Sequence, residues 1–213
     1  MDRVSIMVGS AAMRVGVIGS VVLLAGCSGL NGGGSVSAEF FVEDCPPGTD
    51  KQIEDYGYDA AWLATERYSG VVIVQVQEYR VRIEETDSVA VRIGMDDLIE
   101  SGDLVVDEER ERVLLADPAG LTLPLAFGEG RANATLSLFQ TCANFPTLHA
   151  TSGTLRITDF DLALDAEDTG SDEHIAGSLT ATIARSDDLM VPAGTMVSDF
   201  DFEPPSRPTI SFK

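Results

Sequence analysis

Residues 152–164 read SGTLRITDFDLAL, and residues 175–183 read IAGSLTATI. Both stretches alternate apolar and polar side chains, so that Leu155 and Ile157, for example, fall on one face of the first stretch. A period of two is typical of a strand with one buried face. Because only an acidic loop separates the two stretches, we expect them to form an antiparallel pair.

The same alternation recurs upstream in segments separated by turn residues. Strands are expected over 71–76, 79–83, 89–93, 121–127 and 132–138. The apolar set changes from even to odd numbers after Val76, which predicts a β-bulge or sharp bend near Gln77–Glu78. Pro124 predicts an edge position for its strand. A short helix is expected over about 58–67, and one helical turn over 95–100.

Many short strands with turns between them indicate a mainly β fold. We expect an antiparallel β-sandwich or barrel-like domain with one short helix. The 213 residues are 44% hydrophobic, enough for one domain with a buried core. The net charge of −21 repels phosphate backbones and argues against nucleic-acid binding. Two histidines and three cysteines in the whole chain argue against zinc clusters and most histidine-based catalysis.

The first 27 residues have the layout of an export signal. Residues 15–25 read VGVIGSVVLLA, an uncharged run that follows Arg3 and Arg14. The run ends in Leu24-Ala25-Gly26-Cys27, which resembles the lipobox of bacterial lipoproteins. This resemblance implies cleavage between Gly26 and Cys27 and a diacylglycerol group with an acyl chain on Cys27. Multiple acyl chains anchor a protein stably to a membrane.

Two other interpretations of this segment stay open. A transmembrane helix over residues 4–26 would place Arg14 near its middle, at a cost of about 2.5–3.5 kcal/mol. An ordinary cleaved signal followed by a coincidental cysteine is the second alternative.

The lipobox interpretation divides the chain into three parts. Residues 1–26 are the lipoprotein signal peptide, and residues 27–37 are a Gly/Ser-rich tether that includes SGLNGGGS at 28–35. Residues 38–213 form the acidic β-rich domain. We expect a lipid-anchored, exported protein, and Ser28 after the lipidated cysteine favours the outer membrane if the cell has one.

Cys45 and Cys142 remain once Cys27 carries lipid. An even pair in an oxidising compartment predicts a disulfide between them. Two free buried thiols are the alternative.

The strand pair at 152–164 and 175–183 resembles a recurring element in exported lipoproteins of myxobacteria and related bacteria. In those proteins a Ser-Gly-Thr-Leu-x-Ile-Thr strand is followed by a variable loop and a Gly-Thr-Phe or Gly-Ser-Leu strand. The families concerned mostly have no assigned activity, so the resemblance implies β structure and export only.

The acidic loop that follows residue 164 is the best ligand candidate. Hard oxygen ligands suit calcium, and the weak candidates are Asp165, Glu167, Asp168 and Asp172. The spacing does not match an EF-hand, so a solvated acidic loop is the simpler interpretation. No other metal or cofactor is expected. His174, beside this loop, is a general base, half of a metal site or an ordinary exposed loop residue.

These observations predict a membrane-anchored exported lipoprotein that acts as a structural or binding module of the cell envelope. Its protein or polysaccharide partner is not identified by the sequence. A calcium- or carbohydrate-binding β-sandwich is the first alternative, and an exposed patch of Tyr56, Tyr58, Trp62 and Tyr68 would favour the sugar-binding version. An envelope hydrolase is the less favoured alternative, because no catalytic constellation is visible and we expect no enzyme.

Overall fold

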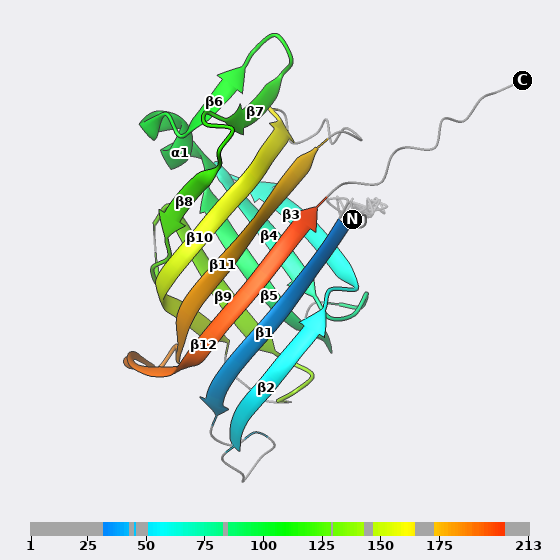
Figure 1. Cartoon of the computed structure of the whole chain (residues 1–213), viewed down its shortest axis with the longest axis vertical. Coiled ribbons are helices and arrows are strands. Elements are labelled where there is room, and N and C mark those ends of the chain that lie inside the picture. Colours follow the sequence, from blue (N-terminus) through cyan, green and yellow to red (C-terminus); the bar gives the residue numbers. More distant parts are fainter. Residues whose placement is uncertain are drawn as a thin grey trace, which may run out of the picture.

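The fold is one antiparallel sheet that curls around its own core (Figure 1). The computed structural model describes residues 32–42, 45, 51–82, 85–128, 130–142, 147–164 and 173–202. The strands in these ranges are β1 (Gly32–Val42), β2 (Lys51–Asp59), β3 (Trp62–Tyr68), β4 (Val71–Gln77), β5 (Asp87–Gly94), β6 (Leu104–Asp107), β7 (Arg112–Leu115), β8 (Leu121–Pro124), β9 (Ala132–Leu138), β10 (Leu148–Ala163), β11 (His174–Arg185) and β12 (Asp188–Phe202). The helix α1 (Met95–Ser101) follows β5.

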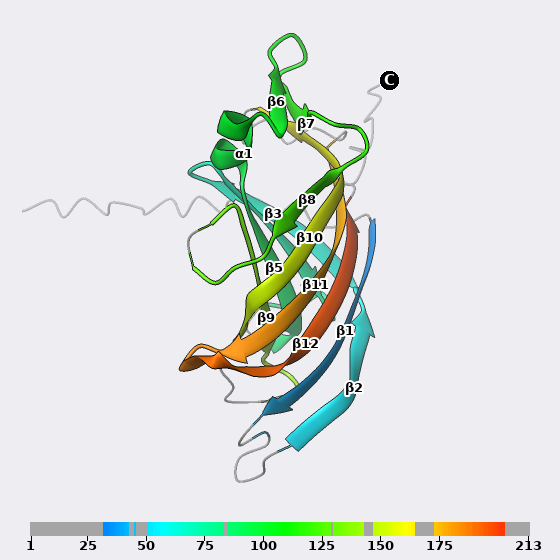
Figure 2. The same cartoon turned by 60° about the vertical axis from the view of Figure 1, so that its left-hand side comes forward.

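The strand order in the sheet is β2-β1-β12-β11-β10-β9-β5-β4-β3, with β7 and β8 added to β10 and β6 added to β7. Figure 2 shows that the half ending in β2 curves in front of the half ending in β3. The result is a half-barrel with a filled interior. This confirms the expected mainly β, antiparallel, barrel-like domain with one short helix.

The interior is a single apolar core between the two halves of the sheet. In β1, β9 and most of β11, every second side chain is buried in it, which explains the period of two in the sequence. The largest fully buried members include Phe40, Phe160, Phe200, Phe202, Leu136 and Leu155. The four phenylalanines come from β1, β10 and β12, so these strands supply much of the volume of the core.

The strand pair that opened the sequence analysis is the longest hairpin of the fold. Strands β10 and β11 pair antiparallel, with Leu155 opposite Leu179. Two register shifts interrupt β10, between Ala150 and Ser152 and between Ile157 and Asp159. Each shift inserts a residue and bends the strand, which helps the sheet to curl.

The predicted tether is partly wrong, because β1 begins at Gly32 rather than after residue 37. Gly32 pairs with Phe202 of β12, and Val36 is already in the core. A Cβ atom on Gly34 would lie 2.8 Å from the Asp199 carbonyl oxygen. Strand β12 therefore approaches too closely for a side chain at this position.

The predicted helix over 58–67 is wrong. This segment is the end of β2, a turn at Ala60–Ala61 and most of β3. Tyr58 and Leu63 belong to the apolar side of their strands, and β3 pairs with β4 along its whole length. Pairing in the sheet overrides the helical preference of the alanines.

The point after Val76 where apolar residues change from even to odd positions is the end of a strand. Strand β4 stops at Gln77, and the chain bends over the next residues, as expected. The predicted strand over 79–83 is wrong for its described residues 79–82, because Tyr79 and Val81 are both exposed and lie in the bend.

Two smaller expectations are confirmed. Helix α1 covers the predicted helical turn, and its C-cap is Gly102 in the left-handed conformation. Strand β8, which contains Pro124, pairs only with β10 and so lies at an edge. In the described part of the chain, no helix has the length and apolar character needed to cross a membrane.

Candidate functional site

Several predicted site residues lie outside the described residues. They are Gly26 and Cys27 of the lipobox and the calcium candidates Asp165, Glu167, Asp168 and Asp172. Within the described ranges, no three His, Cys, Asp or Glu side chains are placed to hold one metal ion.

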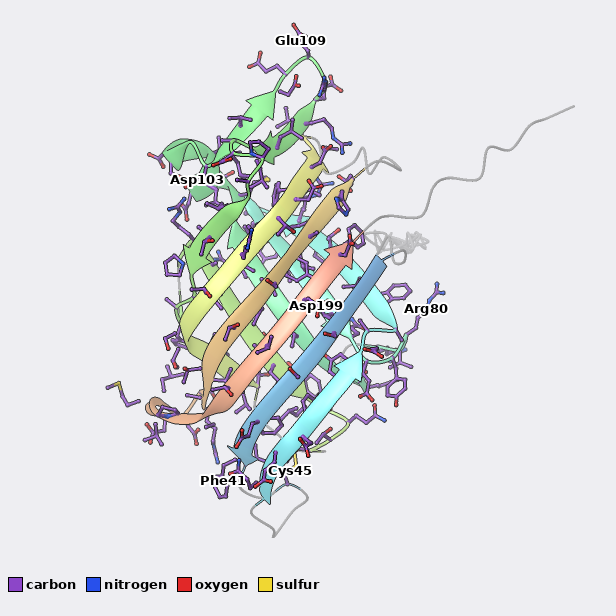
Figure 3. All side chains as sticks on the ribbon, in the orientation of Figure 1. Phe41, Cys45, Arg80, Asp103, Glu109 and Asp199 are labelled. Atoms are coloured by element: carbon purple, nitrogen blue, oxygen red, sulfur yellow. A yellow bond between two sulfur atoms is a disulfide. The ribbon has the colours of Figure 1, made fainter. Side chains whose placement is uncertain are left out.

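The structure joins Cys45 and Cys142 by a disulfide. The two Cα atoms are 4.9 Å apart, and the residues are 97 positions apart in the chain. Both cysteines are almost fully buried. The bond ties the segment after β1 to the segment after β9, at the end of the domain where Figure 3 labels Cys45.

A buried carboxylate organises the backbone next to this disulfide. The Asp87 side chain, on β5, is fully buried and accepts hydrogen bonds from the backbone N–H groups of Gln140 and Thr141 at 2.7 and 3.1 Å. It also accepts from the hydroxyls of Thr141 and of Tyr56, the latter at 2.9 Å. The pKa of Tyr56 is raised far above 10, mainly because the hydroxyl is buried and secondly because of the negative charge of Asp87. Tyr56 is therefore a neutral donor.

Removal of this tyrosine hydroxyl tests the cluster. We expect Tyr56→Phe to lower the free energy of unfolding by about 1–2 kcal/mol, because a buried charged acceptor loses one donor. Tyr68→Phe is the matched control, since Tyr68 is 55% exposed. Urea denaturation measures both. Equal effects of the two changes would contradict the account.

A second cluster of buried charges lies at the other end of the domain. Arg67, on β3, forms an ion pair with Glu173, and the two side chains are 9% and 1% exposed. The Arg67 guanidinium also donates to the Ala163 carbonyl at 2.6 Å. Glu173 in turn accepts from the Ala163 N–H at 3.0 Å. One arginine from β3 thus holds the end of β10 and the residue before β11.

His174 lies between two aspartates on the outer face of the sheet. Its Nδ1 is 2.9 Å from Asp159 of β10, and its Nε2 is 2.7 Å from Asp201 of β12. Partial burial alone would lower the pKa of His174. The hydrogen bonds to Asp201 and Asp159 outweigh it, so the pKa is raised above 6.5. The two carboxylates are 52% and 64% exposed, so this cluster is open to solvent.

The second histidine has the opposite shift. Burial lowers the pKa of His149, whose ring contacts Phe127 edge-on with centroids 5.0 Å apart. An imidazole titration by NMR is expected to give a higher pKa for His174 than for His149.

The raised pKa of His174 also makes the stability of the protein depend on pH. Because its folded pKa lies above 6.5, the stabilisation by protonated His174 is complete below pH 6.5 and is lost as pH rises through the folded value. The excess stability of the wild type over His174→Gln should therefore shrink on alkalinisation. Growth of that excess with pH would contradict the geometry.

The four aromatic residues that could mark a sugar site do not share one surface patch. Tyr56 and Tyr58 pack against the core, with their rings 5.9 Å apart. Trp62 is partly buried under the Arg80 guanidinium, which lies 4.5 Å from its ring centroid. Tyr68 alone among the four is exposed.

The sequence analysis missed the exposed apolar residues around the β11–β12 turn. Met190 and Val191 are 90% and 60% exposed, and Phe41 of β1 is 42% exposed. A surface hollow of about 270 Å³ lies between β1 and this turn. The signal in the sequence was the apolar triplet Leu189-Met190-Val191 directly after a polar turn.

No protein-family model, no curated protein and no solved structure matches the chain. Any functional conclusion therefore rests on the sequence and the geometry of this chain.

Proposed function

We propose that this protein is an exported bacterial lipoprotein, anchored through Cys27, whose β domain is a binding or structural module of the cell envelope. The anchor is diacylglycerol and an acyl chain on the Cys27 sulfur, and the favoured location is the outer membrane if the cell has one.

The pairing of the cysteines carries this proposal. The chain has three cysteines, and the disulfide uses two of them. The third, Cys27, stands directly after Leu24-Ala25-Gly26 at the end of an apolar run. A buried structural disulfide is typical of oxidising compartments outside the cytosol. The disulfide and the lipobox thus support the same location independently.

The start of β1 sets how far the domain stands from the lipid. Four residues separate Cys27 from Gly32. Five residue steps span at most about 18 Å. Anchoring at Cys27 would therefore hold the Gly32 end of β1, which pairs with Phe202, close to the membrane surface.

A binding role is favoured over catalysis by the shape of the domain. Its interior is packed with apolar side chains. Its histidine–aspartate cluster lies on the outer face between exposed carboxylates. The calcium and carbohydrate alternatives have weaker support, since the calcium candidates lie outside the described residues and the four aromatics are dispersed.

Metabolic labelling with palmitate tests the anchor. We expect wild type and Cys45→Ser to incorporate label, and Cys27→Ser to incorporate none, because Cys27 supplies both the thioether and the new amino terminus. Cys45→Ser is the matched control for the loss of one sulfur. Equal labelling of wild type and Cys27→Ser would overturn the proposal.

A further inference from the structure

Strands β1 and β12 separate before either strand ends. Their pairing runs from Gly32 opposite Phe202 to Phe40 opposite Gly194. Beyond this point β1 pairs only with β2. Within residues 188–193 of β12, the register with β11 contains only Asp188 and Pro192, and it shifts on both sides of Ala184. Within the described ranges, this piece of β12 therefore has one edge without a strand partner. An unpaired edge is a template for another extended segment.

A surface hollow lies where the two strands separate. Phe41, Val191, Pro192 and Ala193 form its apolar walls, and its volume is about 270 Å³. An apolar side chain of a partner fits a hollow with this lining.

The rim of the hollow is acidic. Asp187 and Asp188 lie on it, together with Arg185, whose guanidinium is paired with Asp187 at 2.9 Å. Asp188 leaves the rim with a net negative charge, and the whole chain carries −21. Such a field attracts cationic partners and repels anionic ones.

The hollow and Gly32 lie near opposite ends of β1. Strand β1 has 11 residues between the Gly32 end and the end at Val42, a length of about 35 Å. Figure 3 places Phe41 at the end opposite Glu109, and Figure 1 places the β11–β12 turn at the same end as Phe41. If Cys27 is anchored, the hollow lies farther along β1 from the lipid than Gly32 does.

We propose that the splayed edge of β12 and its hollow bind an extended polypeptide segment of another envelope protein, with an apolar side chain in the hollow and Lys or Arg beside it. The partner backbone pairs with residues 189–191, before Pro192, and its cationic side chains face Asp188. The location in the envelope rests on the proposed function, whereas the recognition chemistry rests on the geometry alone.

The test uses fluorescein-labelled peptides and the full chain in phosphatidylcholine vesicles, with anisotropy as the readout. The basic probe is KTKVLVKTK, and ETEVLVETE is its acidic match. A third peptide is the basic probe with its three central backbone amides N-methylated. We expect the basic probe to bind at least about tenfold more tightly than either of the other two, because only it provides both cationic side chains and free backbone donors.

Two matched variants locate the site. Val191→Asp places a charge in the hollow, and Val105→Asp makes the same change on β6, where Val105 is 44% exposed. We expect Val191→Asp to weaken the basic probe about tenfold or more, and Val105→Asp to change it less than about twofold. Equal effects of the two variants, equal affinity for the three peptides, or no binding would each overturn the proposal. The same titrations are made on the Cys27→Ser protein without vesicles. Absence of acyl chains from the wild type would therefore overturn the anchor only, because peptide binding is measured on unanchored protein too.

Discussion

Arg67→Met is expected to lower the free energy of unfolding by about 3–5 kcal/mol. The change leaves the carboxylate of Glu173, 1% exposed, without its cation. It also removes the hydrogen bond from Arg67 to the Ala163 carbonyl, and so releases both the end of β10 and the start of β11. A buried charge without a partner costs far more than an exposed one.

The matched control is the exposed pair of Arg110 and Asp107. Arg110 is 75% exposed in this pair, so Arg110→Met should change stability by less than about 0.5 kcal/mol. The double variant Arg67→Met with Glu173→Met should recover much of the loss, because no buried charge remains. Guanidinium denaturation of all four proteins measures the difference. Similar costs for Arg67→Met and Arg110→Met would show that the Arg67 pair is not buried as described.

Removal of the disulfide is the second change with a large expected effect. Cys45→Ala with Cys142→Ala should lower the free energy of unfolding by about 4–5 kcal/mol at most, because the bond closes a loop across 97 positions. The loop includes β2 to β9, so the reduced unfolded chain gains freedom over nearly half of the molecule.

Cys27→Ser serves as the control for this experiment, since Cys27 lies outside the disulfide. It should leave the unfolding midpoint in guanidinium unchanged, whereas the double variant should shift it strongly. Wild-type protein treated with a reductant in denaturant should refold with the stability of the double variant. Equal stability of reduced and oxidised wild type would contradict a structural role for the bond.

The strands of this domain could be predicted wherever side chains alternate. Strands β9, β10 and β11 each have one apolar and one polar face, and the pairing of β10 with β11 follows from the loop between them. The glycines of β1 carry no such pattern, because Gly32 to Gly34 have no side chains to alternate. Their strand character comes from β12, which is distant in sequence.

The charge clusters could not be predicted, because each joins residues that are far apart in the chain. Arg67 and Glu173 are separated by 106 positions, and Tyr56 and Asp87 by 31. Arg67 also breaks the apolar pattern of its strand, since it lies on the inner side of β3 opposite Val72. The hollow beside Phe41 depends on where β1 and β12 separate, which is a property of register and not of local sequence.

The most direct test of the account is the mass of the amino-terminal peptide of the native protein. We predict a chain that begins at Cys27 and carries the added mass of a diacylglyceryl group, with an acyl chain on the new amino terminus. A chain that begins upstream of Cys27, or a Cys27 with an unmodified thiol, would contradict the anchor and the envelope location inferred from it.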